Sequence, residues 1–360
     1  MKTTDVRVRR AITAVAVGRP VVLIDDTARD ADGHLVFAAD GATPALLAFT
    51  IRHTSGYVRV ALSGTDCERL DLPPMCHTEN GAFGTAANRV SVDCLGSGTG
   101  ISATDRAATI AALASADSTA SDFLRPGHVV PVQARADGVL DRSAPVEAAL
   151  DLARLAGRRP AAALCEIVSR DRPTAMARRG ELVEFAVTHG LPVVSIGELV
   201  TYRRRTEPQV VRLAETLLPT RFGDSRVIGF RDVHPAGAGG EHLAVIVGAV
   251  GAGVPVPLHV HVECLTGDVF GSTACRCRRE LDTALTGMAT QGGGVIVYLR
   301  PAGSARACGL SEGDAAAVNP TSVAWILHDL GVYTLRLSED SPGVGLVMFG
   351  AIREREGGAA

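Results

Sequence analysis

The first part of the chain alternates short apolar runs with segments of helical periodicity. Residues 21–24 are a β-branched run, and a second apolar run at residues 35–38 follows an acidic loop. Residues 147–156 carry apolar side chains at helical spacing and stop at Gly157, which predicts an amphipathic helix. This alternation of strands and helices is typical of an α/β unit.

Capping signals support the same interpretation. Ser102 and Asp105 form a capping-box pattern before an alanine-rich segment, and the free amides of such a helix start suit a phosphate group. An apolar face ending at Gly190 predicts another helix, followed by a strand at residues 191–195. Glu198 then completes a cap for a last helix of this unit.

The last third of the chain has a different pattern. Short β-branched runs separated by glycine and proline in residues 226–262 predict antiparallel strands. Apolar residues spaced along residues 281–288 predict a helix, and residues 295–299 predict a buried strand.

These patterns predict two domains and an α/β (α+β) fold class. We expect a mixed sheet flanked by helices in residues 1–206, a linker at residues 207–222 and a smaller α+β unit in residues 223–360. The length of 360 residues agrees with two domains.

Composition narrows the class of protein further. With 46% hydrophobic residues and a net charge of −3, the chain has no general attraction for nucleic acid or anionic membranes. The longest apolar run, residues 243–258, is broken by glycine and proline, and no leader pattern opens the chain, so we expect a cytoplasmic protein. In that reducing compartment we expect free thiols rather than disulfides at Cys67, Cys76, Cys94, Cys165 and Cys308.

Three further thiols predict a metal site. Cys264, Cys275 and Cys277 follow one another closely, and a loop that turns back would bring their sulfurs around one ion. Zinc suits three thiolates, and a fourth position left to water is the arrangement of a catalytic zinc. The alternative is that these are buried thiols packing as small apolar groups.

The segment around these thiols resembles the zinc-binding segment of GTP cyclohydrolase II, which opens the imidazole ring of GTP. The resemblance is carried by residues 263–272, 275–277 and 280–282. It decays beyond them, because residues 301–310 replace the family's Gln-Glu-Gly-Arg-Gly-Ile-Gly-Leu, whose charged groups hold GTP. His259 and Glu280 also stand where an arginine and a glutamine are expected. We therefore expect a zinc-binding unit that has lost GTP hydrolysis.

The first unit resembles 3,4-dihydroxy-2-butanone 4-phosphate synthase, which converts ribulose 5-phosphate to formate and 3,4-dihydroxy-2-butanone 4-phosphate. Ordered motifs carry this resemblance, at residues 52–56, 68–75, 98–106, 125–129 and 165–167. It implies a sugar phosphate substrate, Mg²⁺ or Mn²⁺ as cofactor and a homodimer.

The same resemblance implies roles for individual residues. His128 and Glu166 match the catalytic histidine and glutamate, and Asp30 stands in place of a metal-binding glutamate. The substrate-binding residues it implies are Arg29, Asp30, His34, Thr54, Ser102, Asp105, Arg142 and Glu147.

Two departures affect the metal site of the first unit. His34 replaces an aspartate, and Pro145, which has no ligand atom, stands where the family has an imidazole ligand. Asp30, Asp32 and His34 alternate along the chain, so an extended segment would offer two oxygens and one nitrogen to one ion, a set suited to manganese or iron. The alternatives are a solvated turn, and a surface substitution at His34 in an inactive site.

Three hypotheses for the function follow. The chain is a working 3,4-dihydroxy-2-butanone 4-phosphate synthase with a rearranged metal site, or a diverged enzyme acting on another sugar phosphate or purine. The third hypothesis is a non-catalytic subunit that binds a partner or ligand. Pro145 separates the first hypothesis from the other two.

Overall fold

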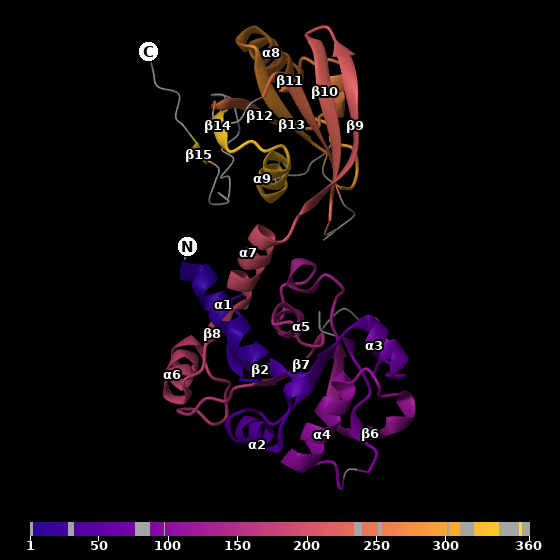
Figure 1. Ribbon diagram of the computed structural model, residues 1–360, viewed down its shortest axis with the longest axis vertical. Helices are drawn as coiled ribbons and strands as arrows, with labels where there is room; N and C mark the ends of the chain where they lie inside the picture. Colours follow the sequence, from indigo (N-terminus) through magenta and orange to yellow (C-terminus); the bar gives the residue numbers. More distant parts are fainter. Residues whose placement is uncertain are drawn as a thin grey trace. The chain divides into compact units, whose positions relative to one another are not determined.

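A computed structural model of the chain describes residues 3–27, 32–75, 87–96, 98–233, 240–250, 254–300, 302–309, 320–337 and 353–354. It divides into two compact units, Met1–Arg203 and Arg204–Ala360 (Figure 1). The division falls inside one helix, α7 (Ile196–Thr206).

A mixed sheet forms the centre of the first unit. Its strand order among the described residues is β4-β6-β3-β7-β2-β1-β8, and β5 pairs with β6. The strands are β1 (Val21–Ile24), β2 (Gly33–Ala38), β3 (Arg59–Leu62), β4 (Ala87–Asn88), β5 (Val92–Cys94), β6 (Phe123–Gln133), β7 (Ala161–Glu166) and β8 (Val193–Ser195). Pairing is parallel between β1 and β8 and between β3 and β6, and antiparallel elsewhere.

Helices cover both faces of this sheet. The other helices of the unit are α1 (Thr3–Ala16), α2 (Pro44–His53), α3 (Gly64–Arg69), α4 (Ala103–Ala114), α5 (Pro145–Leu155) and α6 (Arg179–His189). One apolar core joins α1, α5 and α7 to the sheet, whereas α2, α3 and α4 pack on the opposite face, where a smaller core joins α6. Adjacent residues of β2 enter different cores, Val36 with α5 and Phe37 with α2, because side chains alternate along a strand.

The local signals read from the sequence are confirmed here. The Ser102 hydroxyl accepts a hydrogen bond from the Asp105 N–H, 3.0 Å away, at the start of α4. Ser195 and Glu198 exchange the two hydrogen bonds of a capping box, 3.1 and 3.2 Å long. Gly190 follows α6 with φ +62°, a left-handed conformation that ends the helix without the strain a side chain would bring.

The second unit holds its own mixed sheet. The strand order is β15-β14-β12-β13-β11-β10-β9, from β9 (Val210–Thr220), β10 (Gly223–Asp232), β11 (Glu241–Gly248), β12 (Val256–Val262), β13 (Gly293–Leu299), β14 (Thr334–Leu337) and β15 (Arg353–Glu354). Helices α8 (Cys277–Gln291) and α9 (Pro320–Asp329) complete the unit with a short π-helix, η5 (Leu265–Val269). The two-domain α/β architecture expected from the sequence is confirmed.

Two expectations about this unit are wrong in detail. Residues 210–220, assigned to a linker, form β9, which pairs antiparallel with β10. Almost every side chain of β9 is exposed, so the strand has no buried alternating face that its sequence could reveal. The strands of residues 226–262 are not all antiparallel, because β12 pairs in parallel with β13 and β14.

No helix in the described ranges is long and apolar enough to cross a membrane. Within the described residues no disulfide joins Cys67, Cys94, Cys165 or Cys308, and Cys76 lies outside them.

Candidate functional site

Three polar side chains meet on the face of the first sheet that α5 covers. His34 is the second residue of β2, Arg59 opens β3 and Glu166 closes β7. Strand register places His34 opposite Glu166, and Arg59 opposite Leu164, which packs in the core shared with α5. Because residues two apart share a face, the three side chains gather on one side of the sheet. We call them the His34–Arg59–Glu166 cluster.

Arg59 joins the other two members of this cluster. Its Nη2 lies 3.2 Å from His34 Nε2 and forms an ion pair with Glu166 Oε1. The His34 ring is 3.6 Å from the same carboxylate oxygen. Burial alone would raise the pKa of Glu166, but hydrogen bonding to His34 and the charge of Arg59 outweigh it and lower this pKa to about 2. Glu166 is therefore ionised near neutral pH.

The position of His34 corrects one interpretation from the sequence. The side chain is not on the surface, because His34 is 5% exposed and lies within β2. Gly33 does not bend the segment away, since it pairs with Ile24 as part of the same strand. Asp32 continues this strand pairing through its carbonyl, which accepts from the Asp25 N–H at 2.8 Å. Its proposed companion Asp30, together with Arg29, lies outside the described residues.

His128 is held by a carboxylate from the neighbouring strand. Asp93 accepts from His128 Nδ1 at 2.7 Å and from the His128 backbone N–H at 2.9 Å. This pair of hydrogen bonds fixes the proton on Nδ1 and leaves Nε2 able to accept one. His128 precedes Val130 by two residues, and Val130 pairs with Arg59, so His128 and the His34–Arg59–Glu166 cluster lie at the same end of neighbouring strands.

The predicted phosphate-binding residues lie around α4 and the end of α2. Asp105 accepts from the Gly98 N–H at 3.3 Å, in addition to its own cap by Ser102. Thr54 is buried, and its hydroxyl donates to the Thr50 carbonyl at 2.7 Å. The helix start at Ser102 thus presents backbone amides, whereas the Thr54 hydroxyl is used within the fold.

Arg142 and Glu147, the other predicted substrate-binding residues, bind each other. The distance from Arg142 Nη2 to Glu147 Oε1 is 2.6 Å, and the same oxygen accepts from the Arg135 N–H at 3.0 Å. Glu147 is 0% exposed. Pro145 is the first residue of α5, and the preceding Ala144 provides no side-chain cap, so neither of these two positions offers a ligand atom to a metal.

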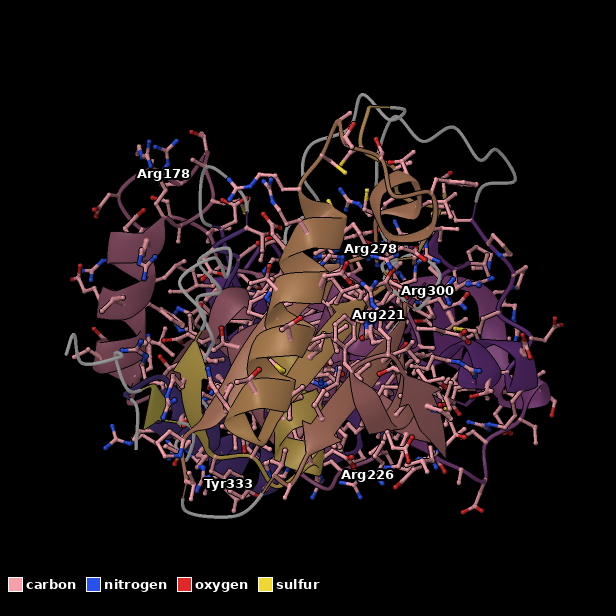
Figure 2. The ribbon with its side chains drawn as sticks, turned by 90° about the horizontal axis from the view of Figure 1, so that it is seen from above. Arg178, Arg221, Arg226, Arg278, Arg300 and Tyr333 are labelled. Atoms are coloured by element: carbon pink, nitrogen blue, oxygen red, sulfur yellow. The ribbon has the colours of Figure 1, made fainter. Side chains whose placement is uncertain are left out.

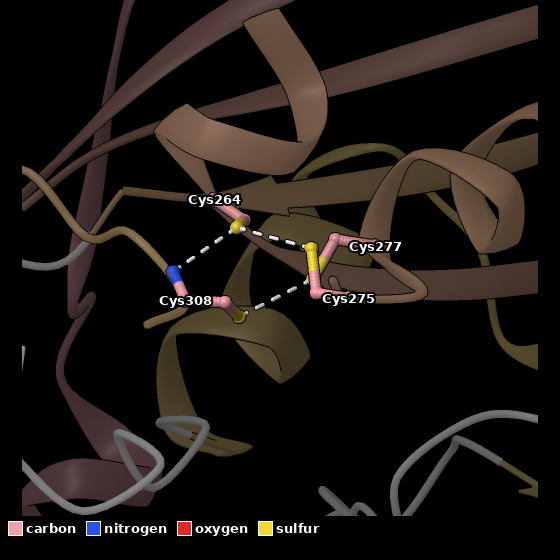
Figure 3. Close-up of side chains that lie close together, drawn as sticks. All are labelled: Cys264, Cys275, Cys277 and Cys308. Carbon is pink, nitrogen blue, oxygen red and sulfur yellow. Dashed lines mark hydrogen bonds between the residues drawn. The ribbon is translucent and has the colours of Figure 1, made fainter. Parts of the chain in front are cut away.

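The second unit gathers four thiols where the sequence predicted three (Figure 3). Cys264 follows β12, Cys275 and Cys277 lie at the start of α8, and Cys308 joins them from residues 302–309. Cys264 Sγ is 3.9 Å from Cys275 Sγ, and Cys277 Sγ is 3.8 Å from Cys308 Sγ. Within the residues that the structure describes, no other group of three or more such side chains could hold a metal. We call these residues the thiol cluster.

Hydrogen bonds prepare this cluster to bind a cation. Burial alone would raise the pKa of Cys264, but hydrogen bonds from the Thr266 hydroxyl and the N–H groups of Cys308 and Gly267 lower it to about 6. A thiolate, the form that binds metal, is thereby favoured at Cys264.

Asp268 braces the loop that carries Cys264. It accepts from the Cys264 N–H at 2.8 Å, from the Tyr298 hydroxyl at 2.8 Å and from His261 Nε2 at 3.0 Å. Burial alone would raise the pKa of Asp268, but these hydrogen bonds, His261 foremost, lower it. The carboxylate therefore ties the loop to β12 and β13.

A cavity of about 720 Å³ borders the thiol cluster, lined in part by Ser272, Cys275, Arg278 and Arg279. Figure 2 labels Arg278 and Arg221, which reach Asp282 at 3.1 and 2.6 Å. The cavity has the size of a small-molecule site. Of the two arginines that line the cavity, Arg278 is engaged by Asp282, which also lines it.

Sequence reasoning missed Arg59, Asp93 and Asp268, and it did not assign Cys308 to the thiol cluster. One signal was available for Arg59, which is a single charge inside an otherwise apolar strand. Asp93 and Asp268 act through partners from other strands, which residue spacing does not reveal.

Comparisons with known proteins agree with both halves of the chain. The family model of 3,4-dihydroxy-2-butanone 4-phosphate synthase matches residues 9–202, and that of GTP cyclohydrolase II matches residues 211–343. The chain is 46% identical to riboflavin biosynthesis protein RibBA of Salinispora tropica, over 94% of this chain and 89% of that protein. Identity to RibBA of Nocardia farcinica is 45%, over 97% and 89%.

Solved structures show the same similarity. RibBX, a two-domain 3,4-dihydroxy-2-butanone 4-phosphate synthase from A. baumannii, matches with a TM-score of 0.71 and 30% identity, covering 98% of this chain and 100% of that chain. A 3,4-dihydroxy-2-butanone 4-phosphate synthase in complex with two magnesium ions matches with a TM-score of 0.52 and 37% identity, covering 56% of this chain and 97% of that chain.

Proposed function

Because the chain belongs to the family of bifunctional riboflavin biosynthesis proteins, which join a 3,4-dihydroxy-2-butanone 4-phosphate synthase domain to a GTP cyclohydrolase II domain, we propose that its first unit converts D-ribulose 5-phosphate to 3,4-dihydroxy-2-butanone 4-phosphate and formate. The observation that supports this proposal is that His128 and the His34–Arg59–Glu166 cluster lie at the same end of neighbouring strands of one sheet.

That placement suits the first step of such a reaction. Enolisation of a ketose phosphate requires a base beside the carbon next to the carbonyl and positive charge near the developing enediolate. His128, oriented by Asp93, removes the proton through Nε2. Glu166 is a weak base because its pKa is lowered to about 2, so its role is to accept a hydrogen bond from a substrate hydroxyl. Arg59 supplies positive charge at the same end of the sheet.

A divalent cation remains part of the proposal. When bound, Mg²⁺ or Mn²⁺ would act as a Lewis acid toward the substrate oxygens. The support is the similarity to the magnesium-bound structure, with Asp30, Asp32 and His34 as the proposed ligands. The described residues fit this set poorly, because the Arg59 guanidinium lies 3.2 Å from His34 Nε2 and would repel a dication there.

For the second unit we propose that zinc binds at Cys264, Cys275 and Cys277 and that GTP hydrolysis is lost. Support for zinc comes from the proximity of the thiols and the hydrogen bonds at Cys264. Support for the loss comes from residues 301–310, where Ser304 stands in place of the family's glutamate and Arg306 is the charged residue that is kept. Each missing hydrogen bond to a charged group weakens binding by about 1.5–3 kcal/mol.

One set of assays tests these proposals. Purified full-length protein should release formate from ribulose 5-phosphate with Mg²⁺ or Mn²⁺, and the His128→Ala variant should not. Formate release from GTP should be absent, and metal analysis should find about one zinc per chain. A pyrimidine product from GTP would contradict the loss of hydrolysis, and zinc unchanged in Cys275→Ser would contradict the thiol site.

A second candidate function is a diverged enzyme that acts on another sugar phosphate. Pro145 at the start of α5 and Arg59 beside His34 favour it, because proline offers no metal ligand and Arg59 places positive charge beside a proposed ligand. It would be supported if ribulose 5-phosphate yielded no formate while a screen of other sugar phosphates found turnover that His128→Ala abolishes. Failure of every substrate would favour a non-catalytic subunit.

We further propose that the protein acts in the cytoplasm as a homodimer, as the family resemblance implies. Sedimentation equilibrium of the purified chain tests the oligomeric state, and a monomer at all concentrations would contradict it.

A further inference from the structure

We propose that Cys308 is the fourth ligand of the zinc ion, so that the thiol cluster forms a closed tetrathiolate site with no position for water. This inference rests on the proposed binding of zinc in the second unit. It changes the class of that site from catalytic to structural.

The spacing of the sulfurs supports four-coordinate binding. Zinc–sulfur bonds of about 2.3 Å place the corners of a regular tetrahedron about 3.8 Å apart. Two sulfur pairs already have nearly this separation, at 3.9 Å for Cys264 with Cys275 and 3.8 Å for Cys277 with Cys308. The ligand atoms of all four residues lie within 4.8 Å of one another, so only a small contraction is needed.

The backbone holds Cys308 against the loop that carries Cys264. The Arg306 carbonyl accepts from the Leu265 N–H at 2.6 Å, and the single proton of the Thr266 hydroxyl is within reach of both the Cys308 carbonyl, at 3.2 Å, and Cys264 Sγ, at 3.4 Å. The Cys308 N–H in turn points to Cys264 Sγ at 3.5 Å (Figure 3). These contacts place the fourth thiol from a segment far along the sequence, which is why residue spacing alone gave only three ligands.

Charge around the cluster is also suited to four thiolates. Zn²⁺ with four thiolates carries net negative charge, which hydrogen-bond donors must compensate. The N–H groups of Gly267 and Cys308 both point to Cys264 Sγ, at 3.3 and 3.5 Å. Cys277 is the first residue of α8, where the helix dipole favours an anion.

The chemical consequence is the loss of a zinc-bound water. A catalytic zinc has three protein ligands and an open position, and it acts by lowering the pKa of the water held there. A fourth thiolate occupies that position. The ion then connects the end of β12, the start of α8 and residues 302–309 without activating a nucleophile.

X-ray absorption spectroscopy at the zinc edge of the full-length protein as purified tests the ligand set. We expect only sulfur scatterers at about 2.3 Å in the natural protein, and three sulfurs with one nitrogen or oxygen at about 2.0–2.1 Å in Cys308→Ser. Cys94→Ser, which removes a thiol of the other unit, should leave the spectrum unchanged. Zinc should also pass to a chelator faster from Cys308→Ser than from either of the other two proteins.

The possible outcomes distinguish the role of Cys308 as fourth ligand from the proposal that the second unit binds zinc. Protein without zinc would overturn the zinc site itself. Zinc held by three sulfurs and one lighter atom in the natural protein would leave the zinc site standing and overturn the role of Cys308. Because this decisive spectrum is recorded on the natural chain, the test does not depend on how well Cys308→Ser folds.

Discussion

Arg59 Nη2 lies 3.2 Å from His34 Nε2, and both groups face the same carboxylate oxygen of Glu166. A guanidinium has no acceptor, so in a hydrogen bond between these two side chains Nε2 is the acceptor. The same nitrogen is 3.6 Å from Glu166 Oε1, so Arg59 and Glu166 compete for it. The positive charge on this face of the sheet belongs to Arg59.

Removal of that charge should affect both activity and acid stability. We expect Arg59→Met to lower formate release from ribulose 5-phosphate by about 100-fold or more, as loss of one charged donor does in other active sites. Arg59→Lys, which keeps the charge but not the planar fork, should lose less.

The same variant should change the dependence of stability on pH. Folding lowers the pKa of Glu166 from 4.5 to about 2, so its ionised form stabilises the protein above pH 4.5, and this stabilisation is lost as the pH falls toward 2. Arg59→Met should show a smaller loss of stability across this range in urea unfolding followed by circular dichroism. Identical pH profiles would mean that Arg59 does not set the ionisation of Glu166.

A second prediction separates the two roles open to His34. If it accepts a hydrogen bond from Arg59, His34→Gln should retain most activity, because the amide oxygen can replace Nε2 as acceptor, whereas His34→Ala should lose it. The preference between Mg²⁺ and Mn²⁺ should be the same in His34→Gln as in the natural protein. Loss of activity in both variants, with a manganese preference confined to the natural protein, would instead indicate a metal ligand.

A third prediction concerns the orientation of His128. Asp93→Asn should lower turnover by about 100-fold, the usual scale of general acid–base catalysis, because the amide can donate to the imidazole and reverse its tautomer. The KM for ribulose 5-phosphate should change little, since Asp93 acts through His128. Asp117→Asn, at an exposed position, is the matched control. An effect on KM alone would assign Asp93 to substrate binding.

Much of the fold could be predicted from local sequence signals, as the caps at Ser102 and Ser195 and the helix end at Gly190 show. Each of these signals depends on residues within one turn of each other. The strand β9 was missed for the opposite reason, since its exposed side chains have no core against which to alternate. Its identity depends on pairing with β10, a contact outside the segment itself.

The residues of the candidate sites likewise fall into those that local sequence signals reveal and those that only the folded chain brings together. Motif resemblance found His128, Glu166 and the first three thiols, which lie within recognisable segments. Arg59 and Cys308 acquire their importance only when separate strands or loops come together, as register sets Arg59 beside the other two cluster residues. Residue type alone could not separate Cys308 from Cys67, Cys94 and Cys165, which are not members of the thiol cluster.

A fourth prediction concerns Asp268, which holds the loop that carries Cys264. Asp268→Asn keeps the shape of the side chain but removes the charge that accepts from His261, Tyr298 and the Cys264 N–H. We expect this variant to lose zinc to a chelator about 10-fold faster or more, the scale seen when groups behind metal ligands are altered. Asp224→Asn on the exposed part of β10 serves as control. Unchanged zinc release in Asp268→Asn would mean that the loop is held by its other contacts.

The last prediction concerns Glu147, which the family resemblance places among the substrate-binding residues. The structure surrounds its carboxylate with Arg142 and the Arg135 N–H and leaves it 0% exposed. Removing one partner of a buried ion pair costs about 3–5 kcal/mol, and the partial exposure of Arg142 moves the expected value for Glu147→Gln to about 3 kcal/mol. Chemical unfolding should detect this loss, whereas Glu184→Gln on the exposed face of α6 should change stability little. The folded fraction of Glu147→Gln should keep a nearly normal KM for ribulose 5-phosphate, because the side chain has no access to a substrate. A raised KM with unchanged stability would return Glu147 to the binding site and make its pairing with Arg142 incidental.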